Sequence, residues 1–209
     1  WLKQGVIEPS WNVPGSIGCW RGCTLDRAVS NFESFKNHVS VLFWSLGNES
    51  YAGDILVEMN RYYKEKDPGR LVHYECVAEN RPYEDLISDM ESQMYAPPEK
   101  IKEYLENNPK KPFILCEYMH DMGNSLGGME SYIRLLDQYE DYQGGFIWDY
   151  IDQALFVKDE VTGRDVLRYG GDFDDRPSDY EFSGNGILFA DRKEKPAMQE
   201  VRHYYGLRR

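Results

Sequence analysis

Continuous apolar runs divide this chain into segments that have the pattern of buried β-strands. Three runs are clear: 41–47 (VLFWSLG), 112–118 (PFILCEY) and 144–150 (GGFIWDY). A strand that is covered on both faces carries such a run, whereas a strand with one solvent face alternates apolar and polar residues. The stretches 71–75 (LVHYE) and 87–95 (ISDMESQMY) show weaker versions of the pattern. We therefore predict five strands.

Between these runs the apolar residues recur at helical spacing. Thr24 is a suitable N-cap for the first helix, and the Asp67-Pro68-Gly69 turn ends the second. Pro97 and Pro98 open the third, since proline is favoured in the first helical turn. The predicted helices cover 25–38, 52–66, 97–107 and 126–140.

Strands that alternate with helices are typical of parallel βαβ units, so the predicted fold class is α/β. A doubly wound sheet usually carries a glycine-rich phosphate turn after its first strand, and Gly47-Asn48-Glu49 lacks that pattern. A (β/α)8 barrel fits better, because its chemistry comes from the carboxyl ends of several strands. Five strands cannot close an eight-stranded barrel, so we predict a partial barrel with further strands upstream.

The composition limits the classes of partner. The chain has 209 residues and a formal net charge of −12, which would repel a nucleic acid backbone. It contains no uncharged apolar run long enough to predict a membrane span. Its four cysteines lack the spacing of a zinc site, and their use suits a reducing compartment. The 16 tyrosines and 5 tryptophans fit core packing as well as sugar stacking.

Two of the apolar runs lead into a glutamate. Glu49 follows the run at 41–47, and Glu117 directly follows Ile114-Leu115-Cys116. Two carboxyl groups at the ends of parallel strands can face one sugar, as glycoside hydrolysis requires. For Glu49 a plain polar turn is the alternative, and Asn48-Glu49-Ser50 also matches a glycosylation acceptor. A purely structural role is harder to assign to Glu117, because a carboxylate beside a buried strand needs hydrogen-bond donors, an opposite charge or a ligand to offset its lost hydration.

Other chemistry-bearing residues have ordinary structural explanations when taken singly. His120 can be a satisfied structural histidine, and Trp148 can be a core residue. The acidic stretch at 170–175 has Pro177 where a calcium loop needs other residues, so a solvated loop is predicted. No G-x-S-x-G elbow supports a nucleophilic serine.

Taken together, the motifs resemble the catalytic barrel of family two glycoside hydrolases, in particular the bacterial lactase-type β-galactosidases. The resemblance covers about residues 25–205 and keeps the family's order. Its longest parts are ILCEYMHDMGNSLGG and QGGFIWDYIDQAL, and it includes Asn37-His38 before VLFWSLGNES, Met94-Tyr95, YGGDFDD and NGILFADR. It implies the catalytic TIM barrel, from about its fourth strand to its eighth.

The resemblance implies a role for each matching residue. Glu49 matches the general acid/base and Glu117 the nucleophile of a retaining mechanism. Asn48 matches a residue at the sugar 2-hydroxyl, and Tyr95 a tyrosine that supports turnover of the nucleophile. His120 matches a residue that contacts the galactose hydroxyls.

Three further matches concern the sugar and the cations. Trp148 matches the ring under the sugar, and Asn185 a residue at the galactose 6-hydroxyl and sodium site. The backbone of Phe182 matches another sodium ligand. The family also uses Mg2+, for which Glu49 is one ligand, while the other two match positions upstream of Trp1.

The resemblance also sets expectations for the whole protein. We expect residues 1–191 to be the later part of the catalytic barrel and 192–209 to lead towards the next β-domain. The expected substrate is a lactose-like β-galactoside, and the full-length enzyme is expected to be a cytoplasmic bacterial homo-oligomer. The 209 residues alone are expected to be inactive. A β-glucuronidase or β-mannosidase relative, or a non-catalytic carbohydrate-binding module, remains the alternative.

Overall fold

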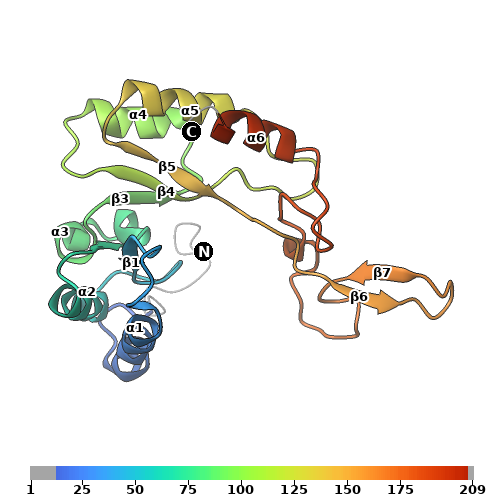
Figure 1. Ribbon diagram of the computed structural model, residues 1–209. Helices are drawn as coiled ribbons and strands as arrows, with labels where there is room; N and C mark the ends of the chain where they lie inside the picture. The colour runs from blue at the N-terminus through green and yellow to red at the C-terminus, as the bar shows by residue number, and fades with distance from the viewer. Residues whose placement is uncertain (1–12, 207–209) are drawn as a thin grey trace. The chain divides into compact units, whose positions relative to one another are not determined.

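The computed structural model describes residues 13–206 and divides the chain into two compact units. One unit contains the residues up to Met94 together with Asn107–Ile114, and the other contains Tyr95–Glu106 and the residues from Leu115 onward. Parallel strands alternate with helices, which confirms the α/β class and the partial barrel (Figure 1). The elements are η2 (Gly18–Trp20), α1 (Arg21–Phe35), β1 (Phe43–Ser45), α2 (Asp54–Lys66), β2 (Leu71–His73), η3 (Cys76–Glu79), η4 (Arg81–Tyr83), α3 (Glu84–Ile87), β3 (Glu91–Met94), α4 (Pro98–Glu106), β4 (Phe113–Tyr118), α5 (Met129–Gln138), β5 (Tyr142–Ile147), β6 (Leu155–Lys158), β7 (Asp165–Arg168), η5 (Tyr180–Ser183) and α6 (Met198–Gly206).

The five predicted strands correspond to β1–β5, but several boundaries differ. Thr24 is not an N-cap, because η2 runs directly into α1 and the helix begins three residues earlier, at Arg21. The predicted strand at 87–95 begins only at Glu91, since Ile87 ends α3. Two strands were missed altogether: β6 and β7 form an antiparallel hairpin.

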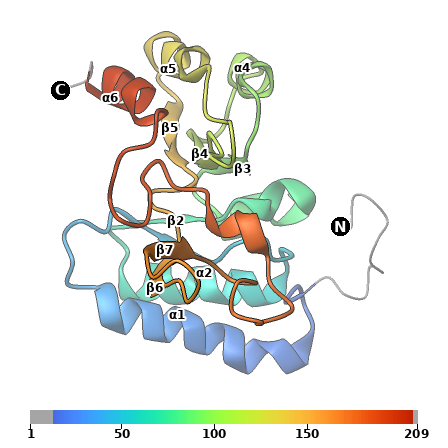
Figure 2. The ribbon, with the colours of Figure 1, turned by 90° about the vertical axis from the view of Figure 1, so that its right-hand side faces the viewer.

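In the first unit, β1 and β2 are parallel, with Ser45 opposite His73. α1 and α2 pack against each other, and Figure 2 shows them side by side. Trp44 of β1 stacks on Tyr63 of α2 with ring centroids 5.2 Å apart, and Phe32 of α1 packs against both rings. The apolar runs of the sequence therefore form the core on which the end of β1 rests.

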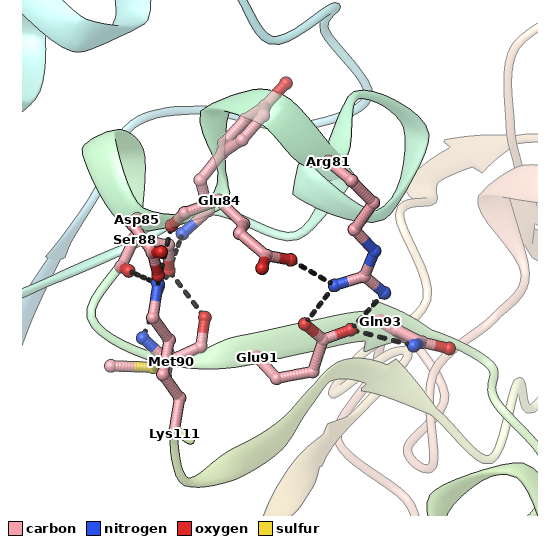
Figure 3. A network of polar contacts seen from close by, with 9 residues as sticks. Arg81, Glu84, Asp85, Ser88, Met90, Glu91, Gln93 and Lys111 are labelled. Carbon is pink, nitrogen blue, oxygen red and sulfur yellow. Dashed lines mark hydrogen bonds and ion pairs between the residues drawn. The ribbon is translucent and has the colours of Figure 1, made fainter. Parts of the chain in front are cut away.

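An ion-pair network fastens the helical segment between β2 and β3 (Figure 3). Arg81 donates two hydrogen bonds to the buried carboxylate of Glu91, at 2.7 and 2.9 Å, and a third to Glu84. Gln93 also donates to Glu91. Lys111 donates to the backbone oxygens of Glu84 and Ser88. Arg81 is itself exposed, but a bidentate pair with a buried carboxylate fixes geometry, so the network holds Glu91 at the start of β3.

His73 is buried beside two hydroxyl groups in the first unit. Its Nδ1 lies 3.0 Å from Ser45 Oγ and its Nε2 2.7 Å from Ser92 Oγ. Burial lowers the pKa of the imidazole to about 4 because desolvation disfavours the charged ring. The three side chains link β1, β2 and β3 on one face.

The buried imidazole predicts a loss of stability in mild acid. The unfolded chain binds a proton at His73 below about pH 6.5, whereas the folded chain binds it only near pH 4, so stability falls as the pH drops through this window. The expected loss is about 3 kcal/mol. Urea unfolding of the whole protein at pH 7 and pH 4.5, compared with His73→Gln, measures it. Equal acid sensitivity of the two proteins would contradict this assignment.

In the second unit, the part of β4 from Leu115 onward is hydrogen-bonded to β5 in one sheet. α4, α5 and α6 lie along one side of β4 and β5 (Figure 1). Gly145 of β5 lies so close to Leu115 that an added Cβ would approach the Leu115 Cβ to 2.7 Å, which requires glycine there. Tyr118 and Tyr205 share a hydrogen bond of 2.8 Å that holds α6 against β4. The ends of β4 and β5 are therefore firmly placed within this unit.

Candidate active site

Glu49 lies in the loop that follows β1, and backbone contacts hold this loop. The Glu49 N–H donates to Glu75 Oε1 at 2.6 Å, and the Tyr74 hydroxyl donates to the Ser50 carbonyl. Ser50 Oγ donates to the Asn48 carbonyl at 3.0 Å. The Glu49 and Asn48 side chains are both exposed. Hydrogen bonds therefore hold the loop backbone in place, while the side chains of Asn48 and Glu49 are open to solvent.

Glu117 lies near the end of β4 and accepts a hydrogen bond from the Tyr95 hydroxyl. The distance from the phenol oxygen to Glu117 Oε2 is 2.7 Å. The Tyr95 N–H also donates to the Glu117 carbonyl at 2.8 Å, which fixes the backbone next to the phenol. A phenol that donates to a carboxylate at this distance makes a strong, charge-assisted bond. One carboxylate oxygen is thus oriented, and the residue stays half-exposed.

His120 connects this pair to Asn185. Its ring stacks on Tyr95 with centroids 5.6 Å apart, and its Nε2 lies 2.6 Å from Asn185 Oδ1. Since an amide oxygen only accepts, Nε2 carries the proton in this arrangement. Asn185 Nδ2 donates to the Phe182 carbonyl, and the Phe182 ring lies 6.2 Å from the His120 ring. Asn185 is buried, so its amide has a fixed place.

Trp148 lies just past β5, and its backbone joins the same region. The Trp148 N–H donates to the Tyr118 carbonyl at 3.0 Å, and its own carbonyl accepts from Asp121 N–H at 2.8 Å. The Asp149 N–H donates to the Asn185 carbonyl at 2.7 Å. The indole is half-buried. Backbone hydrogen bonds therefore connect the segments that carry His120, Trp148 and Asn185.

Backbone strain marks the strand ends. Glu49, Tyr95 and Met119 have φ angles of 47°, 53° and 54°. Residues other than glycine rarely adopt this left-handed region, and the cost is about 1–3 kcal/mol each. Such residues cluster at functional sites, where the surrounding structure holds them. All three come within four residues of the end of a strand, and two of them are candidate site residues.

Asp121, next to His120, was not singled out from the sequence. Its side chain is buried, and among the described residues its Oδ2 has no hydrogen-bond partner. Desolvation raises the pKa of this carboxyl, and the nearby charge on Lys195 partly offsets the effect. Lys195 itself donates to Asp152 at 2.8 Å. The segment behind His120 therefore contains a buried acidic group that no sequence pattern indicated.

The structure thus brings six of the predicted residues together in one unit and places two in the other. Those in the second unit are Tyr95, Glu117, His120, Trp148, Phe182 and Asn185. Asn48 and Glu49 belong to the first unit. Within residues 13–206, no three histidine, cysteine, aspartate or glutamate side chains form a group that could hold a metal ion. The Phe182 carbonyl and the Asn185 amide nevertheless lie next to each other.

Chemically, the second unit offers an oriented carboxylate with a phenol donor, an imidazole whose Nε2 proton is donated to Asn185, and a partly exposed indole. A carboxylate of this kind can act as a nucleophile towards an activated carbon. The polar neighbours suit a ligand that is rich in hydroxyl groups, and the indole offers a flat apolar surface. No described helix is both long and apolar enough to cross a bilayer.

Comparison with known proteins gives a consistent result. The family described as glycosyl hydrolases family 2, TIM barrel domain, matches residues 1–208. The chain is 72% identical over 206 residues to a β-galactosidase large subunit of Latilactobacillus sakei, covering 99% of this chain and 33% of that protein. It is 60% identical to a β-galactosidase of Halalkalibacterium halodurans, covering 98% of this chain and 20% of that protein. The chain therefore spans a third or less of the length of these relatives.

Solved structures with the same fold are more distant in sequence. A Ruminococcus gnavus β-glucuronidase matches with a TM-score of 0.60 at 17% identity, over 90% of this chain and 35% of that one. A β-galacturonidase from Eisenbergiella tayi, solved with galacturonate, matches with a TM-score of 0.59 at 16% identity, over 90% and 37% of the two chains. At this level of identity the likeness concerns the fold alone.

Proposed function

This chain belongs to glycosyl hydrolases family 2, and on that premise we propose that the whole protein hydrolyses terminal non-reducing β-D-galactose residues with retention of configuration. The observation that carries the proposal is the hydrogen-bonded group of Glu117, Tyr95, His120 and Asn185 at the strand ends. The names of the most similar relatives support the choice of sugar. Because the chain spans a third or less of these relatives, the activity belongs to the whole protein and is not expected of these 209 residues alone.

The proposed reaction is a double displacement between two carboxyl groups. Glu117 attacks the anomeric carbon and forms a glycosyl ester while Glu49 gives its proton to the leaving glycosidic oxygen. Glu49 then takes a proton from water, which attacks the same carbon and releases galactose with Glu117 as the leaving group. This mechanism requires the two carboxyl groups to lie about 5 Å apart.

The remaining residues would bind the sugar. His120 donates its Nε2 proton to Asn185, and its ring packs against Tyr95 and Phe182, so its Nδ1 would accept a hydrogen bond from a sugar hydroxyl. The half-buried Trp148 indole would stack under the apolar face of the pyranose. Asn48, exposed beside Glu49, would bind the 2-hydroxyl.

Two cations belong to the proposal. Na+ prefers oxygen ligands, and the Phe182 carbonyl and Asn185 Oδ1 would hold it beside the sugar's 6-hydroxyl. In the structure these two oxygens accept hydrogen bonds from Asn185 Nδ2 and from His120 Nε2, and Na+ would take the place of these donors. Glu49 would supply one carboxylate oxygen to Mg2+, with the other ligands outside this chain. The bound cations would supply positive charge near the sugar. Inside residues 13–206, no group of three or more histidine, cysteine, aspartate or glutamate side chains includes Glu49.

We further propose that the whole protein is a cytoplasmic, oligomeric bacterial enzyme. Cys19 and Cys23 are exposed thiols in the described part of the chain, which suits a reducing compartment. The Latilactobacillus sakei relative is named a large subunit, which supports an assembly that contains a second, smaller chain rather than the expected homo-oligomer. The net charge of −12 argues against a nucleic acid partner.

A substrate panel tests the proposal. The purified whole protein, in buffer with Mg2+ and Na+, is given aryl β-galactoside, β-glucuronide and β-mannoside. The galactoside is expected to be hydrolysed with a kcat/KM at least 100-fold above the others, which corresponds to about 3 kcal/mol of discrimination. Hydrolysis mainly of the glucuronide or the mannoside would reassign the substrate, and hydrolysis of none would favour a non-catalytic module.

Replacement of Tyr95 with phenylalanine tests the phenol contact. The variant loses the 2.7 Å hydrogen bond to Glu117 Oε2 and keeps the ring that stacks on His120. A hydrogen bond to a charged group contributes about 1.5–3 kcal/mol, so kcat is expected to fall by about 10- to 150-fold. Steady-state kinetics on an aryl galactoside measure it, with Tyr139→Phe as the control because the Tyr139 hydroxyl donates to the exposed Glu106. Unchanged kcat in Tyr95→Phe would remove the phenol from the mechanism.

A further inference from the structure

Glu75 is a buried acidic residue that the reaction described above does not use. It lies two residues past the end of β2, and only 4% of its surface is exposed. Burial of a carboxylate costs several kcal/mol unless it receives hydrogen bonds, so its contacts show what it stabilises.

One of these contacts is the backbone of Glu49. Glu75 Oε1 accepts the Glu49 N–H at 2.6 Å. A carboxylate that accepts a backbone N–H at this distance forms a charge-assisted bond, about twice as strong as a neutral one. The bond also acts on a residue with a φ of 47°, a conformation that glutamate adopts only when its surroundings impose it.

The strand register explains why Glu75 reaches this loop. Ser45 lies opposite His73 in the parallel pair, and the two side chains contact each other on one face. Beyond this pair, the Leu46 N–H donates to the His73 carbonyl at 3.0 Å, so the segments that follow β1 and β2 leave the sheet as neighbours. The neighbouring Tyr74 donates its hydroxyl to the Ser50 carbonyl. Tyr74 and Glu75, which follow β2, therefore bind the backbone of two adjacent loop residues, Ser50 and Glu49.

We propose that Glu75 is a positioning residue for the acid/base Glu49, acting through the hydrogen bond from the Glu49 backbone N–H to its buried carboxylate. The inference rests on the proposed function, because it requires Glu49 to protonate the leaving group. Glu75 itself touches neither substrate nor the reacting atoms. Its loss displaces the Glu49 carboxyl from the glycosidic oxygen and leaves the nucleophile Glu117 in its own unit untouched.

Rates on two substrates with different leaving groups distinguish a loss of Glu49 positioning from a general loss of structure. The alcohol of an alkyl β-galactoside must be protonated as it leaves, whereas 2,4-dinitrophenyl β-galactoside releases 2,4-dinitrophenolate, a stable anion that needs little help from an acid. A displaced Glu49 therefore slows the alkyl substrate selectively. Damage to the fold lowers the rate on both substrates equally, because it lowers the amount of active enzyme.

The experiment measures kcat/KM of the whole protein on both substrates for Glu75→Ala and Glu75→Gln. Glu75→Ala is expected to lose about 10- to 100-fold more on the alkyl galactoside than on the dinitrophenyl one. Glu75→Gln keeps an acceptor oxygen without the charge, and its selective loss is expected to be about 3- to 10-fold. Glu65→Gln, on the exposed side of α2, is the matched control and is expected to behave as the unsubstituted protein.

The outcomes are distinct. Equal losses on the two substrates in the glutamine variant would overturn the positioning role, even if the alanine variant does not fold. If the unsubstituted protein does not hydrolyse either galactoside, the proposed function fails first. If Glu49→Ala shows the leaving-group dependence and both Glu75 variants lack it, the proposed function stands and only the inference about Glu75 is wrong.

Discussion

Replacing Glu117 with glutamine is expected to reduce turnover of an aryl β-galactoside by the whole protein by about four orders of magnitude or more. The amide keeps the size of the side chain and can still accept the hydrogen bond from Tyr95. It cannot form the glycosyl ester, because a neutral amide is a poor nucleophile. The expected loss is therefore chemical, with the local structure preserved. Single-turnover and steady-state rates on 2,4-dinitrophenyl β-galactoside measure it.

A control and a direct identification accompany this variant. Glu140→Gln changes an exposed glutamate of the same unit and is expected to leave turnover unchanged. A 2-deoxy-2-fluoro-galactosyl fluoride is expected to label the unsubstituted protein on the peptide that contains Glu117, because the fluorine slows release of the ester. Near-normal turnover by Glu117→Gln, or a label on another residue, would remove Glu117 from the role of nucleophile.

The predictable part of the fold is the part that is buried on both faces. The runs that contain Trp44 and Ile114 predicted β1 and β4 because a fully covered strand has few polar residues. The hairpin of β6 and β7 was missed because both strands are mostly exposed and short. It depends on the turn between Asp159 and Arg164, where the Asp159 carboxylate accepts from Thr162, and such local contacts leave no long periodic pattern.

Much of the candidate site follows from one sequence signal, the carboxylate that comes just after an apolar strand. The signal selected Glu49 and Glu117, and it was equally present in LVHYE, where Glu75 was overlooked. Glu75 and Glu49 differ in burial. Glu75 is buried and accepts a hydrogen bond from the loop backbone, while Glu49 is exposed. A sequence shows that a glutamate ends a strand but does not show which atoms it contacts.

The resemblance implied that Tyr95 acts on Glu117, but the sequence did not show which atoms make the side-chain contacts of the second unit. The bond between Tyr95 and Glu117 joins residues 22 positions apart, and that between His120 and Asn185 joins residues 65 apart. Each depends on which strand ends become neighbours in the folded sheet. For Asp121 even the resemblance supplied no role, and its burial became visible only in the structure.

Replacing Glu49 with alanine is expected to produce a loss that depends on the leaving group. For an alkyl β-galactoside, kcat/KM of the whole protein is expected to fall by about 10²- to 10⁴-fold, the usual contribution of a general acid. For the dinitrophenyl substrate, kcat/KM is expected to change little, while kcat falls because the water that attacks the ester has lost its base.

Added azide then distinguishes the loss of a base from every structural effect of the same substitution, including any loss of Mg2+ affinity. Azide is an anion that attacks the glycosyl ester without giving up a proton, so it replaces the function that Glu49 performs in the second step. Sodium azide is therefore expected to restore kcat of Glu49→Ala on the dinitrophenyl substrate and to yield β-galactosyl azide, with no effect on Glu65→Ala. An azide product of inverted configuration, or no rescue at all, would mean that another residue serves as the acid/base.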